Sequence, residues 1–150
     1  MIRDEDFMRE VEACERTLYR ICRTMLRSEM DCQDAAQNAV FQAWRNLHTL
    51  KNDPMFSHWL IRIAINECRK IYRKKANTLP LDDATPAPDG NERFWEMLHG
   101  LDEKYRIPAM LYYGEQYKIS DIAAILHLPE GTIKRRLHTA RNLLKEELLP

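Results

Sequence analysis

A run of cationic side chains near the end of the chain is the stretch best suited to bind an anion. From Thr132 to Lys145 there is no acidic residue, although the 150-residue chain has a formal net charge of zero. Lysine and arginine neutralise phosphates, whereas arginine forks and amide groups read base edges. The side chains of this run that we expect to face nucleic acid are Thr132, Lys134, Arg135, Arg136, His138 and Arg141.

Two helices joined by a tight turn are predicted to position that run, within Tyr117–Leu148. Ser120 is placed to cap a first helix ending near Leu126, and Pro129 fits the first turn of a second. The first has apolar residues at helical spacing: Ile119, Ile122, Ala123 and Leu126. The second has an apolar stripe of Ile133, Leu137, Ala140, Leu144 and Leu148. This arrangement indicates a helix-turn-helix that reads duplex DNA. A solvated basic helix without a ligand is the alternative.

A second cluster of cations lies in the middle of the chain. The stretch Arg62–Lys75 holds six basic residues against one acid. Cations favour the C-terminal end of a helix through its macrodipole, but six of them exceed what that effect requires. The residues that concentrate along one exposed side are Asn66, Arg69, Lys70 and Arg73. Two basic helices in separate parts of one chain would contact DNA at two separated places.

Helical periodicity also predicts three helices in the part of the chain that ends at Lys75. The first predicted helix, Asp4–Leu26, has its apolar face at Phe7, Val11, Cys14, Leu18, Ile21 and Met25. The second, Asp31–Leu47, has inward-facing Ala35, Ala36, Ala39, Val40, Ala43, Trp44 and Leu47. The third runs from Pro54 to about Lys75 and is expected to bury Phe56, Trp59, Leu60, Ile63, Ala64 and Ile71. Strand patterns are nearly absent.

The stretch Ala76–Asn91 separates the chain into two parts. It holds three prolines, one glycine and three aspartates, with few apolar residues. Such a composition cannot bury enough surface to offset the entropy of ordering, which indicates a flexible linker. A long loop within one domain is the less common alternative. We therefore predict an all-α fold of two small helical domains, residues 1–75 and 92–150, joined by an acidic, proline-rich linker at 76–91.

The second domain is predicted to begin with two further helices. One starts around Phe94, Met97, Leu98 and Leu101, and Asp102 is placed to cap the next, Glu103–Tyr113. Pro108 within that helix removes a backbone hydrogen bond, which costs about 3 kcal/mol unless the helix bends. We expect a kink at Arg106–Pro108.

No motif of an active site is present in the sequence. It has no phosphate-binding glycine loop, nucleophile elbow or zinc-protease helix, so no enzyme activity, catalytic residue or cofactor is predicted. Cys14, Cys22, Cys32 and Cys68 are scattered without a CxxC pair, and no metal site is predicted. The charged N-terminus MIRDEDF lacks the apolar core of a signal peptide. These features favour reduced thiols and a cytoplasmic protein.

Four segments, in this order, resemble the bacterial RNA polymerase sigma factors of the extracytoplasmic-function group. They are DCQDAAQNAVFQAW (Asp31–Trp44), FSHWLIRIAINECRKIYRKK (Phe56–Lys75), LDEKYRIPAMLYY and ISDIAAILHLPEGTIKRRLHTAR. The resemblance covers about Glu12–Leu148 and includes the acidic linker. It implies a first domain that docks on core RNA polymerase and holds single-stranded −10 bases, with the polar segment His48–Met55 next to the basic helix. It implies a second domain that binds the −35 element.

The resemblance also implies roles for individual residues. The polymerase-facing positions are Asp34, Gln37, Asn38, Phe41 and Trp44. The −10 positions are those on the basic helix that ends at Lys75, and the −35 positions are those on the second helix of the helix-turn-helix. An anti-sigma protein that covers these surfaces is implied as a further partner. Where the family has an acid followed two residues on by an aromatic, this chain has Asn38 and Val40, with Phe41 adjacent.

The sequence therefore predicts an alternative sigma factor that directs promoter-specific initiation. A stand-alone helix-turn-helix regulator is the main alternative, but it would need a dimer interface, and no apolar patch is left over for one. An interaction module whose basic helices bind an acidic protein is a third possibility. Polymerase-dependent initiation discriminates the first from the other two.

Overall fold

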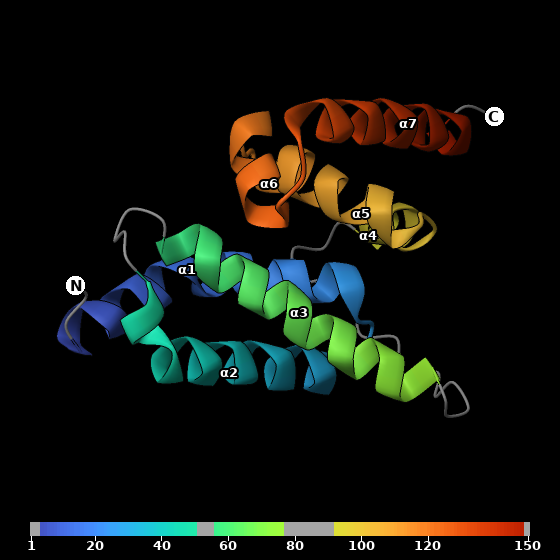
Figure 1. Ribbon diagram of the computed structural model, residues 1–150. Helices are drawn as coiled ribbons and strands as arrows, with labels where there is room; N and C mark the ends of the chain where they lie inside the picture. The colour runs from blue at the N-terminus through green and yellow to red at the C-terminus, as the bar shows by residue number, and fades with distance from the viewer. Residues whose placement is uncertain (1–3, 51–55, 77–91, 149–150) are drawn as a thin grey trace. The chain divides into compact units, whose positions relative to one another are not determined.

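A computed structural model describes residues 4–50, 56–76 and 92–148, and within these ranges the regular structure is entirely helical. The chain divides into two compact units, residues 1–85 and 86–150. The predicted all-α class with two helical parts is thus confirmed (Figure 1). The predicted linker 76–91 lies outside the described residues, except for Ala76, which is the last residue of a helix.

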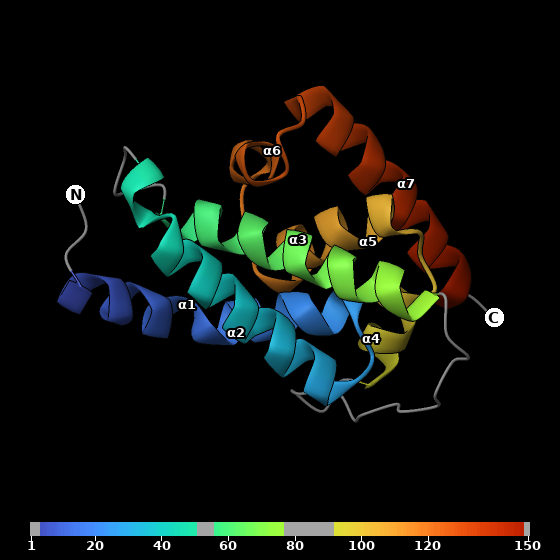
Figure 2. The ribbon, with the colours of Figure 1, turned by 60° about the horizontal axis from the view of Figure 1, so that its bottom comes forward.

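Unit 1 is built from three long helices, each packed against the other two. They are α1 (Asp4–Met25), α2 (Glu29–Arg45) and α3 (Phe56–Ala76), with a short 3₁₀ turn, η1 (Leu47–Thr49), after α2. Figures 1 and 2 show these helices side by side in both views. Their bounds agree with the three predicted helices to within two residues, because strong apolar periodicity defines each of them.

The apolar face of α1 is buried as its spacing predicts. Six residues of that face lie in the core, namely Phe7, Val11, Cys14, Leu18, Ile21 and Met25. On α2, Ala35, Ala39 and Ala43 are fully buried, and their small side chains let the neighbouring helices approach closely. Ser28 caps α2, since its hydroxyl accepts a hydrogen bond from the Asp31 N–H at 3.3 Å.

The predicted inward face of α2 was too wide. Ala36, Val40 and Leu47 are half-buried and Trp44 is exposed, whereas Cys32 and the three alanines are the buried residues of α2. On α3, Phe56, Leu60 and Ala64 are buried as predicted, whereas Trp59, Ile63 and Ile71 are half-buried. Residues that the prediction missed complete the α3 core: Ile61, Ile65 and Cys68. A helix that packs against two others buries more than one stripe.

Three cysteines, one from each long helix, lie at zero exposure in the core of unit 1: Cys22, Cys32 and Cys68. Burial raises the pKa of the Cys32 thiol from its ordinary value to about 12. A hydrogen bond with the Cys22 thiol, together with burial, raises the pKa of Cys68. All four cysteines are free thiols, and they pack as small apolar side chains. Within the described residues there is no cluster of three metal-binding side chains.

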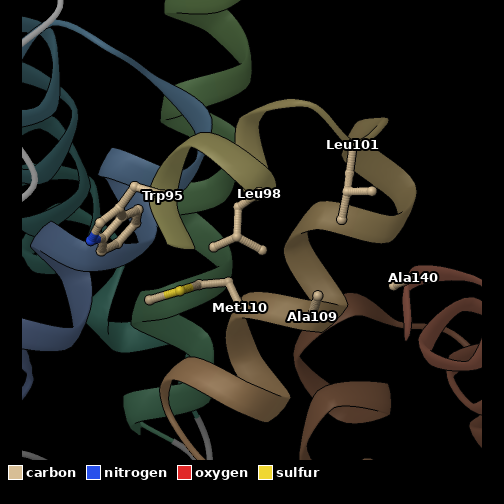
Figure 3. Packing of buried hydrophobic residues seen from close by; sticks show 6 residues of the cluster. All are labelled: Trp95, Leu98, Leu101, Ala109, Met110 and Ala140. Carbon is tan, nitrogen blue, oxygen red and sulfur yellow. The ribbon is translucent and has the colours of Figure 1, made fainter. Parts of the chain in front are cut away.

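Unit 2 contains α4 (Glu92–His99), α5 (Glu103–Ala109), a π-helical turn η3 (Met110–Gly114), α6 (Ile119–Leu126) and α7 (Glu130–Leu148). Figure 3 shows its apolar cluster, to which α4, α5 and α7 all contribute: Trp95, Leu98, Leu101, Ala109, Met110 and Ala140. The packing of α5 against α7 through this cluster fixes the second helix of the predicted helix-turn-helix.

Pro108 lies inside α5, and a π-helical turn, η3, follows directly after this helix. In η3 the Glu115 N–H donates to the Met110 carbonyl at 3.0 Å, a π-type bond. Asp102 occupies the cap position of α5, but its side chain makes no capping hydrogen bond. Instead its carbonyl accepts from the Tyr105 and Arg106 N–H groups, each at 2.9 Å.

Candidate nucleic-acid and protein interfaces

The short turn between α6 and α7 is defined by a left-handed residue and by backbone hydrogen bonds at the two helix ends. His127 adopts a left-handed conformation with φ 55°, and the Leu128 N–H donates to the Ala123 carbonyl at 3.1 Å. These features form a Schellman-type helix end. The Pro129 carbonyl then accepts from the Thr132 N–H at 3.0 Å, so the proline directly precedes α7. The two helices are thus joined by three residues.

Two details of the predicted helix-turn-helix are corrected. Lys118, not Ser120, holds the cap position of α6, so Ser120 lies within the first turn. The buried residues of α6 are Ile122 and Ile125, whereas the predicted Ile119, Ala123 and Leu126 are half-buried. The stripe of α7 is confirmed at Ile133, Leu137 and Ala140, which are buried, and Leu144, which packs against the core cluster.

The outer face of α7 presents the cations of the predicted −35 set. Lys134, Arg135, His138 and Arg141 are exposed, and Thr132 and Arg136 are half-buried beside them. The Arg135 guanidinium donates to the Thr132 hydroxyl at 3.3 Å, which holds the arginine along the first turns of the helix. Asn142, which the prediction omitted, lies 3.4 Å from the His138 ring and is exposed as well. This face can bind phosphates and base edges together.

The predicted −10 residues lie on α3, and two of their cations, Arg69 and Lys70, have partners on the same helix. Arg69 donates to the Asn66 amide oxygen at 3.3 Å. The Lys70 ammonium lies 3.2 Å from the carboxylate of Glu67, whose side chain is 9% exposed. Arg73 is exposed on the same helix. The basic face of α3 therefore carries less unpaired charge than its composition suggests.

A polar pocket of about 320 Å³ adjoins this face. It is lined by the end of α2, η1 and α3, through Gln42, Asn46, Thr49, Trp59, Ile63, Asn66, Glu67 and Lys70. Amide groups and a half-buried indole are the chemistry that binds an unstacked base, by hydrogen bonds to its edge and by stacking. The sequence predicted Asn66 and Lys70 of this set, and Thr49 within the polar segment His48–Met55. It did not predict that Gln42, Asn46 and Trp59 lie beside them, because α2 and α3 share no motif that indicates this.

The predicted polymerase-facing residues share the exposed side of α2. Asp34, Gln37 and Asn38 are exposed, and Phe41 and Trp44 are 59% and 46% exposed despite their size. The Trp44 ring packs edge-on against Phe7 of α1, with ring centroids 5.1 Å apart. Large apolar side chains that stay exposed beside a carboxylate are typical of a protein-binding surface.

Family matches fall separately in the two units. Residues 11–78 match the Sigma-70 region 2 family and residues 91–144 match the Sigma-70, region 4 family. The ECF RNA polymerase sigma factor SigM of Mycobacterium tuberculosis is 33% identical over 134 residues, which span 84% of this chain and 68% of SigM. This chain is an ECF RNA polymerase sigma factor.

Further relatives support this membership. The ECF sigma factor SigW of Bacillus subtilis is 28% identical over 97% of this chain and 90% of its own. The fold resembles that of the sigma factor RpoE, solved with the anti-sigma factor NepR from Bartonella quintana, with a TM-score of 0.83 at 24% identity over 96% of this chain and 97% of RpoE. It also resembles CnrH, solved with the cytosolic domain of CnrY, with a TM-score of 0.81 at 25% identity over 97% of this chain and 89% of CnrH.

The matched regions contain every candidate surface of this sigma factor. The region 2 match includes α2, α3 and the polar pocket, and the region 4 match includes the outer face of α7. No helix among the described residues is long and apolar enough to cross a membrane.

Proposed function

We propose that this sigma factor binds core RNA polymerase through α2 and directs it to promoters with two separated elements. Unit 2 places the outer face of α7 in the major groove of the −35 element. Unit 1 holds unpaired −10 bases in the polar pocket beside α3. The chain acts as an initiation factor without catalytic residues of its own, and we assign its two modules to residues 1–75 and 92–150.

One observation carries the proposal, namely the different chemistry of the two DNA-facing surfaces within one chain. The α7 face is cationic and convex, as a major-groove helix must be. The α3 surface has a pocket of about 320 Å³ lined by amides and an indole, which suits a single base removed from its stack. A stand-alone regulator that binds a duplex palindrome has no use for a base pocket, so the sigma-factor function is favoured over that alternative.

An inhibitory protein is the third partner that we propose. The sigma factor RpoE, which has the same fold, has been solved with the anti-sigma factor NepR, and CnrH, which also shares the fold, has been solved with the cytosolic domain of CnrY. An inhibitor that covers α2 would block access to polymerase without altering either DNA-facing surface.

The experiment is run-off transcription by core polymerase with and without the full chain, together with a core-polymerase pull-down. Wild type should retain polymerase and initiate at specific start sites. Asp34→Arg should weaken retention of polymerase, because it reverses a charge on the exposed side of α2. Gln33→Arg adds the same cation at an exposed neighbouring position and is the control. Retention by Asp34→Arg that equals that of wild type removes Asp34 from the polymerase interface.

A further inference from the structure

The C-terminal end of α3 extends about two turns beyond the core of unit 1. Cys68 is fully buried, and the helix continues from it to Ala76. Residues 69–75 form a projecting segment in which every side chain is half-buried or exposed. A helix end that buries little apolar surface frays readily, because few tertiary contacts hold it. Arg73, one of the predicted −10 residues, lies in this projecting segment.

An ion pair connects the projecting segment to α2. The Lys75 ammonium contacts the Asp31 carboxylate, and the two side chains are 50% and 15% exposed. Figures 1 and 2 show α2 and α3 running in opposite directions, so the last turn of α3 lies near the first turn of α2. The acid stands near the N-terminal end of its helix and the base near the C-terminal end, where the helix dipoles favour these charges. Asp31 therefore anchors the end of α3.

The anchored lysine points away from the side of α3 that we assign to DNA. Residues two positions apart on an α-helix are separated by about 200° around its axis. Lys75 points to α2, so Arg73 projects from the opposite side of the helix. Asn66 is seven positions before Arg73 and shares its side, and Asn66 lines the polar pocket. Lys75 thus fixes the position of the helix end and leaves the contact with DNA to Arg73.

We propose that Asp31 is a positioning residue for promoter binding. Through Lys75 it holds the last turns of α3 in helical form, so that Arg73 stays directed at the DNA backbone beside the −10 bases. In this role Asp31 contacts neither DNA nor polymerase, and it lies outside the predicted polymerase-facing set. The inference rests on the proposed function, since the direction of Arg73 matters only if α3 faces promoter DNA.

Charge and position predict opposite results for a variant of Asp31. Removal of a carboxylate from beside a basic helix raises the local positive charge, so Coulomb attraction alone would tighten DNA binding. Loss of the anchor lets Arg73 move and weakens DNA binding instead. Lys75→Gln removes a cation and the same anchor. Asp31→Asn and Lys75→Gln therefore shift the affinity in opposite directions if charge alone acts, and in the same direction if the anchor acts.

The first test measures promoter binding by core polymerase with the full chain, on a promoter selected from a randomised library by run-off transcription with wild type. Asp31→Asn and Lys75→Gln should each weaken binding about threefold, which is the effect of one lost phosphate contact. Asp31→Glu and Lys75→Arg keep the ion pair and should bind as wild type does. Glu29→Gln removes the same charge from the first turn of α2 and is the control for charge. Tighter binding by Asp31→Asn overturns the proposal.

A double variant tests whether the effect passes through Arg73. Arg73→Ala should weaken promoter binding by a similar factor, and Asp31→Asn added to it should cause no further loss, because the positioned side chain is gone. Losses that multiply show that Asp31 acts elsewhere, which overturns the assignment. A pull-down with core polymerase should retain Asp31→Asn as well as wild type. Weaker retention means that Asp31 acts at the polymerase interface instead.

Hydrogen exchange of the full chain tests the anchor without DNA or polymerase. Asp31→Asn should speed exchange of the amides of residues 72–75 by about two- to fivefold, whereas the amide of Cys68 should be unaffected. Asn keeps the backbone N–H that donates to the Ser28 hydroxyl, so the cap of α2 is retained. Thermal melts establish that the variant folds. Unchanged exchange at residues 72–75 overturns the anchor.

The two kinds of measurement separate this inference from the function on which it rests. If wild type with core polymerase binds no promoter, the proposed function fails, even where exchange shows that the anchor exists. If wild type binds a promoter and Asp31→Asn speeds exchange but binds equally well, the anchor exists and its role in promoter binding is wrong. Faster exchange together with weaker binding by both Asp31→Asn and Lys75→Gln supports the proposal.

Discussion

The basic faces of α3 and α7 resemble each other in sequence but differ in the partners of their cations. On α3, Lys70 lies 3.2 Å from the carboxylate of Glu67, and Lys75 forms an ion pair with Asp31 of α2. On α7, Arg135 contacts a hydroxyl, that of Thr132, and the sequence from Thr132 to Lys145 contains no acid. Two runs of similar composition thus differ in how many of their cations are available to bind DNA phosphates.

This difference suits two kinds of DNA. A helix that enters a duplex groove gains affinity from unpaired cations, which release condensed counterions. A surface that holds unstacked bases depends more on stacking and on amide hydrogen bonds, as in the pocket beside α3. We therefore expect unit 2 to supply most of the salt-dependent affinity and unit 1 to supply readout of single-stranded bases.

The largest expected effect is on the α7 face. Arg135→Ala should weaken binding to a matched −35 duplex by about 1–3 kcal/mol and relax the preference at one base, since an arginine fork on guanine is lost.

Arg141 lies further along the helix, so Arg141→Ala should weaken binding to all duplexes alike. It should also reduce the slope of log binding constant against log salt concentration by about one released ion. Titrations of the full chain bound to core polymerase, at several salt concentrations, measure both. An exchange of these two outcomes means that α7 is oriented differently in the groove.

The pocket beside α3 gives the next effect. Trp59→Ala should weaken binding of single-stranded −10 DNA by about 1–3 kcal/mol, because one base loses its stacking partner. Trp59→Phe keeps a ring and is the matched control. Binding to the −35 duplex should not change in either variant. A Trp59→Ala variant with normal −10 binding means that the pocket holds no base.

These surfaces were predicted to different degrees from the sequence. Every predicted −35 residue lies on or beside the outer face of α7. The apolar stripe of one helix shows which face is buried, and the opposite face is therefore exposed. Gln42 and Trp59 of the pocket were not predicted to face −10 bases, since they come together only when α2 and α3 pack. The same reason explains why Ile61 and Ile65 were not predicted as core residues: α3 contacts two helices, and periodicity alone reveals one stripe.

Helix ends were also set by features that residue type does not reveal. Ser120 is a good capping residue, yet α6 begins at Ile119 with Lys118 at the cap position. The Lys118 carbonyl accepts from the Ile122 N–H at 3.0 Å, so the helix is capped two residues earlier than the serine suggests. In α5 the helix continues through Pro108, although this proline donates no backbone hydrogen bond, and a π turn follows at Met110–Gly114.

Alkaline pH should affect the two units differently, because all four cysteines lie in unit 1. Burial raises the pKa of Cys32 to about 12 from an ordinary value of 9.0, so the folded state keeps a proton that the unfolded chain loses. The stabilising contribution is therefore complete below about pH 9 and declines as pH rises towards 12. Denaturant unfolding of wild type and of Cys32→Ala measures the free energy of unfolding at each pH. The difference between the two free energies should shrink as the pH rises through this range. A difference that stays constant with pH contradicts a raised pKa of Cys32 in the folded state.

The smallest expected effect concerns the charge that Glu67 neutralises. Glu67→Gln keeps the size of the side chain and removes the ion pair with Lys70. The slope of the logarithm of the DNA-binding constant against the logarithm of the salt concentration should steepen by up to about one released ion. The reason is that the Lys70 ammonium becomes available to a phosphate. Glu96→Gln, an exposed change on α4, is the control for net charge. An unchanged slope in Glu67→Gln means that Lys70 does not face DNA.

The division of labour between the two units is tested most directly by run-off transcription from a promoter library with randomised upstream and downstream blocks. Core polymerase with the full wild-type chain should enrich two separated sequence blocks. Arg135→Ala should relax only the upstream block and Asn66→Ala only the downstream block. Enrichment of a single palindromic block, bound equally well without polymerase, would contradict the account.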